Sequence, residues 1–313
     1  MVRIRARRRR PGLQPQHLKA VEAATLLCGA RVTGAVAGSQ ELRFEPGAVR
    51  SGEWSLDVGT AGAVTLVAQS ILVPALASEC RVRFDLRGGT DTSWSPSVDY
   101  LAAVTLPALA GFGSGELVVE RRGYYPRGGG RAVLELVGSA RMPPPLLCER
   151  RPEVERIGGV SHASAPLRPR RVAERQAEAA ATALGVLGVP IEIDVEYGRT
   201  LSTGSGIVVW TAGSEPALAG SALGERGRRA EEVGAAAARG LLRELEAGAA
   251  VDRFLADQLV PFLALAGGRL RTSEISEHAR SNVEVARAVL GAELRVDDDR
   301  RLIEAPGPVG LGR

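Results

Sequence analysis

The 313-residue sequence predicts an α/β protein of repeated α+β units with a smaller α/β segment inserted. Two observations predict this fold class. Runs of β-rich and helical character succeed one another along the chain, and their order recurs at a distance. A proline-rich stretch, MPPPLL at 142–147, is a plausible linker and marks where a different arrangement begins.

Helical periodicity and β-rich runs define the elements of the repeated part. Helical patterns occur at 16–28, 63–76, 98–110, 254–266 and 282–290. Strand-like runs occur at 2–5, 41–44, 54–58, 81–86, 116–120, 132–137, 270–274, 293–296 and 302–304. From residue 61 the order is helix, strand, helix, strand, strand, and from residue 254 it is the same again. This recurrence indicates an internal repeat.

The N-terminal part reads as a further, truncated copy of the repeat. Counting back from residue 58 gives two strands, a helix and a strand at Val2–Arg5, which is the same unit without its first helix. We therefore expect three two-helix, four-strand units, the first of them incomplete. The four arginines at 7–10 would then lie at a strand-to-helix junction, although a solvated basic arm is an open alternative.

The middle of the chain has its own element order. A strand-like VERIGGV precedes a helix at 172–184, strands at 191–196 and 206–212, and a helix at 231–246. We predict a small α/β domain at 151–249, inserted into a repeat domain formed by 1–150 and 250–313.

Composition excludes several classes of protein. The longest apolar stretch, 62–77, is interrupted by polar residues and falls short of the roughly 20 residues of a spanning helix, so no membrane is expected. The segment after the N-terminal arginines lacks the apolar core of a signal peptide. Three widely spaced cysteines predict a reducing, cytoplasmic setting without a structural zinc site. Arginine supplies 39 of the 40 basic residues, and its planar fork suits phosphate.

Individual motifs leave two interpretations open when they are taken alone. GGTDTSWSPSVDYL at 88–101 fits a structural turn, or backbone N–H groups that receive an anion. RRGYYPRGGGRA at 121–132 fits a hairpin or a ligand loop, and it lacks the P-loop pattern. Of the three histidines, His278 stands out because it lies at a junction equivalent to 86–97. A neutral imidazole is a good nucleophile toward phosphorus.

The motifs together resemble the RNA 3'-terminal phosphate cyclase family, from residue 2 to about 305. They are IRARRRRPGLQPQHLKAVEAA, GSQELRFEPG, GTAGAVTLVAQSILVP, GGTDTSWSPSVDYL, RRGYYPRGGG, SALGERGRRAEEVG, FLADQ and HARSNVEV, in this order. The resemblance implies three repeats, similar to the C-terminal domain of a bacterial translation initiation factor, and an inserted thioredoxin-like domain. It also implies ATP-dependent conversion of an RNA 3'-phosphate into a 2',3'-cyclic phosphate.

The resemblance assigns roles by motif. His278 matches the histidine that accepts AMP from ATP, and Arg8 matches an arginine of the phosphate site. The positions that match ATP contacts are Gln69, Pro126, Phe254, Leu255, Ala256, Asp257 and Gln258. The implied cofactors are ATP and a divalent metal, Mg or Mn, with no metal ligand assigned. The implied partner is RNA with a 3'-terminal phosphate.

The chain departs from the family at its start. Family members begin with a strand and a GEGGGQ-type loop, which supplies an acidic residue near the metal and another phosphate-site arginine, and this sequence has neither. We expect a gene start assigned too late, or a damaged or repurposed member. The alternative function is that of a catalytically impaired binding protein in RNA processing or ribosome biogenesis. Because an inactive relative of that kind lacks the nucleophilic histidine, His278 argues against it.

Overall fold

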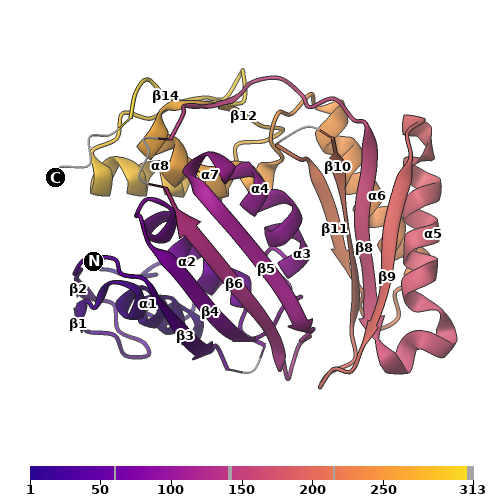
Figure 1. Ribbon diagram of the computed structural model, residues 1–313, viewed down its shortest axis with the longest axis horizontal. Helices are drawn as coiled ribbons and strands as arrows, with labels where there is room; N and C mark the ends of the chain where they lie inside the picture. The colour runs from indigo at the N-terminus through magenta and orange to yellow at the C-terminus, as the bar shows by residue number, and fades with distance from the viewer. Residues whose placement is uncertain (60, 140–142, 214–215, 309–313) are drawn as a thin grey trace. The chain divides into compact units, whose positions relative to one another are not determined.

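The computed structural model describes residues 1–59, 61–139, 143–213 and 216–308 (Figure 1). The chain divides into two units, and each is described by itself. Among the described residues, no helix is both long and apolar enough to cross a membrane. Unit 1 comprises Met1–Val98, Phe112–Ala140 and Arg199–Ser202, and unit 2 comprises Asp99–Gly111, Arg141–Gly198 and Thr203–Arg313.

Unit 1 contains a four-stranded sheet of order β3-β4-β6-β5. The β3–β4 pair is parallel, and the other two pairs are antiparallel. Helices α1 and α2 pack on each other, and α2 packs on β4 and β6. The elements are α1 (Pro15–Cys28), β1 (Arg31–Thr33), β2 (Arg43–Glu45), β3 (Gly52–Asp57), α2 (Val64–Leu76), β4 (Arg81–Gly88), β5 (Gly113–Arg121) and β6 (Gly130–Gly138).

Alternation within β4 explains why this strand lies inside the sheet. Val82, Phe84 and Leu86 are fully buried, and they are two residues apart, so they share one face. Helix α2 is apolar over most of its surface, and Pro74 falls only two residues before its end at Leu76. The proline therefore removes one backbone hydrogen bond, the one that residue 74 would donate to Ser70 O, in the last turn of the helix.

Unit 2 contains a sheet of order β13-β14-β12-β7, which repeats the pairing pattern of unit 1. The β7–β12 pair is parallel, and the other two pairs are antiparallel. Helix α7 packs on α8 and on β12 and β14. The elements are β7 (Leu146–Cys148), α7 (Arg253–Ala266), β12 (Gly268–Arg271), α8 (Glu277–Leu290), β13 (Arg295–Asp297) and β14 (Leu302–Ala305).

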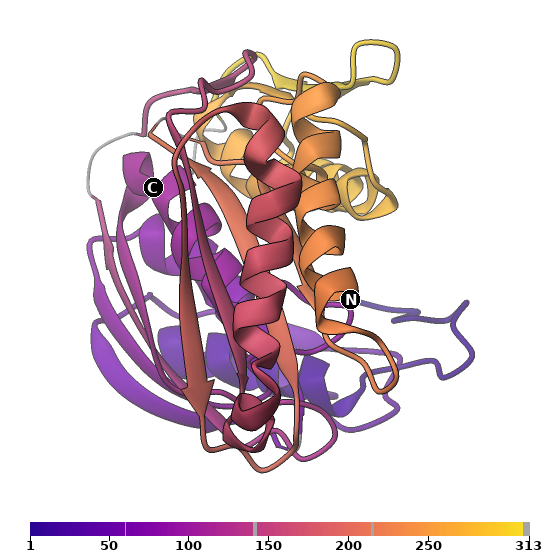
Figure 2. The ribbon, with the colours of Figure 1, turned by 90° about the vertical axis from the view of Figure 1, so that its right-hand side faces the viewer.

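A second sheet of unit 2, of order β11-β10-β8-β9, carries α5 and α6 on one face (Figure 2). Strands β8 and β9 are parallel and are joined through α5, whereas β10 and β11 follow as antiparallel neighbours. Its own core includes Ile157, Leu184, Val209, Val233 and Leu241. The elements are β8 (Arg156–Ser164), α5 (Val172–Leu184), β9 (Ile191–Gly198), β10 (Ser205–Ala212), β11 (Ala219–Leu223) and α6 (Ala230–Glu246).

The strand predicted at Val2–Arg5 is wrong. The segment forms turns, because Arg3 and Arg5 adopt left-handed backbone angles, φ 56° and 52°, which no strand accommodates. It is nevertheless anchored, since the N–H of Ile4 donates to Gln40 O at 3.0 Å and the N–H of Gly12 donates to Ile4 O at 2.9 Å. Residues 7–10 are exposed and lack helix or strand.

Other differences concern boundaries and short strands. The predicted linker at 142–147 partly forms β7, while Met142 lies outside the described residues. Helix α8 begins at Glu277 rather than at residue 282. The helix predicted at 98–110 consists of α3 (Val98–Tyr100), a π-helical turn at Leu101–Thr105 and α4 (Leu106–Ala108). Strands β1, β7 and β11 were not predicted.

Candidate active site

A single carboxylate holds the start of α7. Asp252 is the N-cap residue, and its Oδ1 accepts hydrogen bonds from the backbone N–H groups of Phe254 and Leu255, both at 2.9 Å. The Tyr100 hydroxyl donates to the same oxygen at 2.7 Å, and the N–H of Ala219 donates to Oδ2 at 3.1 Å. These contacts place the FLADQ segment, Phe254–Gln258, on the first turns of α7.

The five side chains of this segment differ in their exposure to solvent. Leu255 and Ala256 are fully buried, so their side chains belong to the core of unit 2. Phe254 is 47% exposed, and the Arg253 guanidinium lies 4.7 Å from the centroid of its ring. Phe254 therefore presents an aromatic face beside a positive charge, which suits stacking on a nucleobase and attraction of phosphate.

Asp257 is a carboxyl group in a mostly buried position. Burial raises its pKa to about 7, and the nearby Asp252 carboxylate adds to this rise, while a hydrogen bond with the Ser276 side chain opposes it. Ser276 is the N-cap residue of α8, and its Oγ accepts from the N–H of Ala279 at 3.0 Å. The Asn282 amide donates to Asp257 O at 2.7 Å. Asp257 thus links α7 to the first turns of α8.

Gln258 is held by two hydrogen bonds. Its Oε1 accepts from the Thr105 hydroxyl at 3.0 Å, and its Nε2 donates to Phe254 O at 2.9 Å. Thr105 ends the π-helical turn at 101–105, a distortion that often occurs at functional sites.

His278 is the second residue of α8 and is exposed. Because Ser276 and Asn282 both contact Asp257, the turn that carries His278 lies against the predicted nucleotide segment. The N-terminus of a helix favours anionic groups through its free N–H groups and its dipole. The structure therefore brings together six of the predicted residues, His278 and Phe254–Gln258, at the starts of two helices in unit 2.

The other predicted residues lie in unit 1. Gln69 is half-buried on α2, and Pro126 is exposed after a cis Tyr125–Pro126 bond. Arg8 is exposed, and its backbone N–H donates to Arg5 O at 3.0 Å. Gln69, Pro126 and Arg8 thus belong to unit 1, whereas His278 and Phe254–Gln258 belong to unit 2.

Unit 1 has a pocket of about 720 Å³ close to two of these residues along the chain. Its lining includes Leu66, one turn before Gln69, and Tyr125, which precedes Pro126; Gln69, Pro126 and Arg8 are not part of it. Trp94, also in the lining, is 99% exposed. The complete lining is Gln16, His17, Ala20, Ala61, Ala63, Leu66, Thr92, Ser93, Trp94, Ser95 and Tyr125.

His17 is a pocket residue that the sequence did not single out. Its Nδ1 accepts from the N–H of Gln14 at 3.0 Å, which completes a capping box at the start of α1. Burial lowers the pKa of His17, and the positive charge of Arg5 lowers it further. Gln14 and His17 do not match the usual Ser/Thr-x-x-Glu/Gln pattern of a capping box, and no local sequence signal indicates the pocket.

The 88–101 motif forms a structural turn in its first part. Asp91 is buried and accepts from the Thr90 hydroxyl at 2.7 Å and from Arg122 at 3.3 Å. The N–H of Gly123 donates to the Thr90 hydroxyl at 2.9 Å. This network ties the turn to the 121–132 loop. His162 is equally internal, because it is buried in β8 with Nε2 3.7 Å from Asp99 Oδ2.

Comparison with known proteins identifies the family. The model of the family RNA 3'-terminal phosphate cyclase matches residues 1–296. An RNA 3'-terminal phosphate cyclase of Pyrococcus furiosus is 46% identical over 95% of this chain and 86% of its own length. The Archaeoglobus fulgidus cyclase is 46% identical over 96% and 90%, and the Pyrococcus abyssi cyclase is 43% identical over 100% and 90%. The chain therefore belongs to the RNA 3'-terminal phosphate cyclase family.

Proposed function

We propose that this protein uses ATP to convert the 3'-terminal phosphate of RNA into a 2',3'-cyclic phosphodiester. The observation that carries the proposal is the arrangement of His278 beside Phe254–Gln258, at the N-termini of α8 and α7. An exposed imidazole in the first turn of α8, a helix start that contacts Asp257 of the same segment as the exposed Phe254 ring, is suited to nucleotidyl transfer.

The chemistry proceeds in three substitutions at phosphorus. An imidazole nitrogen of His278 attacks the α-phosphorus of ATP, forms a P–N bond and releases pyrophosphate. An oxygen of the RNA 3'-phosphate then attacks the same phosphorus, which frees the histidine and leaves AMP on the RNA end. The neighbouring 2'-hydroxyl loses its proton, attacks the terminal phosphorus and expels AMP. Covalent catalysis divides one difficult activation into smaller steps.

The remaining predicted residues would bind and orient ATP. Phe254 offers its ring to the adenine, while Leu255 and Ala256, whose side chains are buried, would contribute backbone groups. We propose Gln69, Pro126, Asp257 and Gln258 as further ATP contacts. Arg8 would offset the charge of the transferring phosphoryl group. Oxygen ligands suit a divalent cation, Mg or Mn, and Asp257 offers the only carboxylate among these residues.

We further propose the family fold for the two units. The shared pairing of β3-β4-β6-β5 and β7-β12-β14-β13 supports repeated two-helix, four-strand units. The βαβ-ββα order of β8 to α6 supports a thioredoxin-like insert at 151–249 within a repeat domain of 1–150 and 250–313. The three cysteines are free in the structure, and the cytoplasmic setting stays a prediction from their spacing.

The nucleophile is tested by covalent labelling. Incubation with ATP labelled at the α-phosphate should give an adduct that survives alkali and is lost in acid, as phosphoramidates behave. His278→Ala should abolish the label, whereas His17→Ala and His162→Ala should retain it. Because His162 is buried, circular dichroism should first show that its variant is folded. A His278→Ala protein that still labels fully would overturn the assignment.

A further inference from the structure

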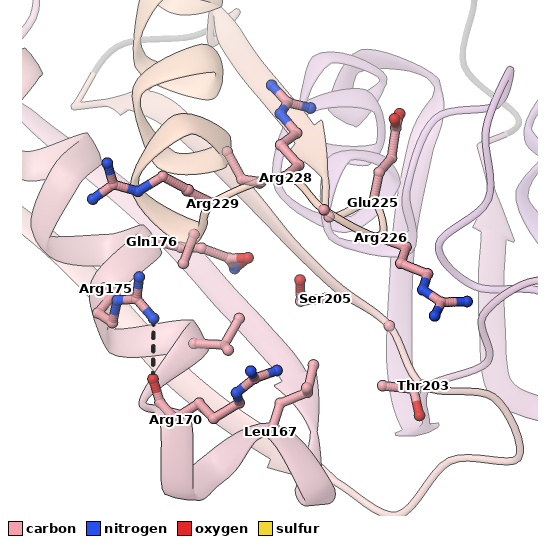
Figure 3. A pocket seen from close by; sticks show the side chains of 16 residues that line it. Leu167, Arg170, Arg175, Gln176, Thr203, Ser205, Glu225, Arg226, Arg228 and Arg229 are labelled. Carbon is pink, nitrogen blue, oxygen red and sulfur yellow. Dashed lines mark hydrogen bonds between the residues drawn. The ribbon is translucent and has the colours of Figure 1, made fainter.

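The SALGERGRRAEEVG motif has no role in the site described above, yet it lines a pocket of unit 2. The pocket has a volume of about 670 Å³ and lies between the starts of α5 and α6, next to the first residues of β10 (Figure 3). Its lining is Leu167, Arg170, Val172, Arg175, Gln176, Thr203, Gly204, Ser205, Gly224, Glu225, Arg226, Gly227, Arg228, Arg229, Ala230 and Val233.

Charge is the dominant property of this pocket. Five arginines line it, against the single carboxylate of Glu225. Moreover, the N-cap residues of α5 and α6, Arg171 and Arg229, make no side-chain cap hydrogen bond, although the Tyr197 hydroxyl accepts from the N–H of Ala173 in α5 at 3.0 Å. Two helix N-termini and a set of guanidinium forks therefore meet at one hollow. This combination favours groups with several negative oxygens, above all phosphates.

Three of the arginines are used to hold the pocket together. Arg175 makes a two-pronged ion pair with Glu231, at 2.8 and 2.9 Å, which lowers the pKa of Glu231 to about 2. Arg229 lies 3.7 Å from the same carboxylate. Arg228 donates to Leu223 O at 3.2 Å and so braces the 224–229 loop.

Arg170 and Arg226 differ from these three. Both are exposed, and neither guanidinium forms an ion pair with a described residue. In Figure 3 the Arg170 guanidinium points toward the middle of the hollow. These two arginines therefore carry positive charge that the described part of the protein leaves uncompensated.

A buried amide adds a second, independent indication of a ligand. Gln176 is fully buried, and its Nε2 donates to Ser161 Oγ at 3.2 Å and to Gly206 O at 3.1 Å. Its Oε1 has no hydrogen-bond partner among the described residues, and Figure 3 shows the amide directed toward Ser205 in the pocket. An unpaired acceptor suits a hydroxyl group, since it would repel a phosphate oxygen.

We propose that this arginine pocket, defined by the lining residues above, is a binding site for the sugar-phosphate backbone of RNA. RNA carries both kinds of group that the pocket would bind. Its phosphates would contact the arginines, and a ribose hydroxyl would donate to the Gln176 oxygen. Inorganic phosphate has no ribose hydroxyl. The proposal rests on the proposed function, in which RNA is the substrate. It assigns the pocket to internal phosphodiesters rather than to the reacting 3' end.

The test compares two double variants of the full chain. Arg170→Ala/Arg226→Ala removes the two uncompensated charges of the pocket. Arg239→Ala/Arg243→Ala is the matched control, because both residues are exposed on α6 and neither lines the pocket. Fluorescence anisotropy would measure the binding of labelled single-stranded RNA with a 3'-phosphate, and of the same RNA with a 3'-hydroxyl, over a range of salt concentrations.

We expect the pocket variant to bind both RNAs about tenfold more weakly than the wild type, because each lost guanidinium removes a phosphate contact. The slope of log Kd against log salt should fall by about 1.4, at roughly 0.7 for each contact to a single strand. The control should keep the wild-type affinity and slope.

Two outcomes would overturn the proposal. In the first, the pocket variant binds RNA like the control. In the second, it loses affinity only for the 3'-phosphate RNA, which would assign the pocket to the terminal phosphate. Labelling by ATP, measured without RNA, should be unchanged in both variants and shows that they are folded. If the wild type itself fails to label, the proposed function fails, but the RNA comparison still decides the pocket.

Discussion

At the scale of single residues, the environment of Asp257 has a consequence for stability. Burial and the neighbouring Asp252 carboxylate raise the pKa of Asp257 to about 7 in the folded protein, far above that of an aspartate in an unfolded chain. The folded state therefore holds this proton more tightly. Its stability contribution is largest below about pH 4 and is lost as the pH rises toward 7.

Asp257→Asn, which is neutral at every pH, should remove this dependence. Below about pH 4 the variant and the wild type should have similar free energies of unfolding, and between pH 5 and pH 8 the advantage of the variant should grow by about 2–3 kcal/mol. Urea unfolding at the two pH values measures the difference. If the gap between the two proteins does not widen from pH 5 to pH 8, the raised pKa is wrong.

Asp252 stabilises the start of α7 through four accepted hydrogen bonds, two of them from N–H groups of the first turn of that helix. Asp252→Ala removes the cap and leaves buried donors without their acceptor. It should destabilise the protein by about 3 kcal/mol, since a cap contributes about 1 kcal/mol and each unsatisfied donor costs about 1–3 kcal/mol. Asp252→Asn keeps an acceptor oxygen and should cost less than half as much. Thermal unfolding distinguishes the two, and equal losses would contradict this account.

At the scale of elements, long periodic segments were predicted well. The helix at 172–184 agrees with α5 at both ends, and 254–266 differs from α7 by one residue. Three short strands, β1, β7 and β11, were missed, and one of them, β7, has a remote partner. Strand β7 has three residues and pairs with β12, about 120 residues later, so nothing local distinguishes Leu146–Cys148 from a linker.

The error at Val2–Arg5 has a different physical cause. Alternation of arginine and isoleucine over four residues fits a strand, but the hydrogen bonds of Ile4 are made to Gln40 and Gly12 across turns. Tertiary contacts thus outweighed local pattern. The candidate site followed mainly from motif resemblance. Periodicity placed Phe254–Gln258 and His278 on or near two helix starts, but the contacts of Asp257 with Ser276 and Asn282 required the fold.

Equivalent positions in two helices carry the same amide. Gln69 is the sixth residue of α2 and Gln258 is the sixth residue of α7, and each helix begins the same order of elements. Thr105 fixes the side chain of Gln258. The match is consistent with the proposal that both glutamines contact ATP, since each lies at the same position in the equivalent helix of its own unit.

At the scale of the whole molecule, the parallel pairing of β7 with β12 determines how the chain enters and leaves its middle segment. The N–H of Leu146 donates to Gly267 O at 3.0 Å, and Leu146 lies opposite Gly268. The chain from 149 to 267 is therefore a long connection between β7 and β12, and the pairing of these two strands holds its ends together.

This closure predicts how the molecule opens. Residues 156–249 have a hydrophobic core of their own, with twelve buried residues. Because β7 and β12 already hold the two ends together, the segment avoids the entropy cost of loop closure, which is about 4 kcal/mol for a loop of this length. The segment should unfold and refold as one cooperative unit while β7 and β12 remain paired. In native-state hydrogen exchange, the amides of β8, β10 and α6 should then share one opening free energy, lower than that of β12 and α7. Reversible opening of this kind would let the arginine pocket release the RNA that we propose it binds, while α7 and the start of α8 with His278 stay folded.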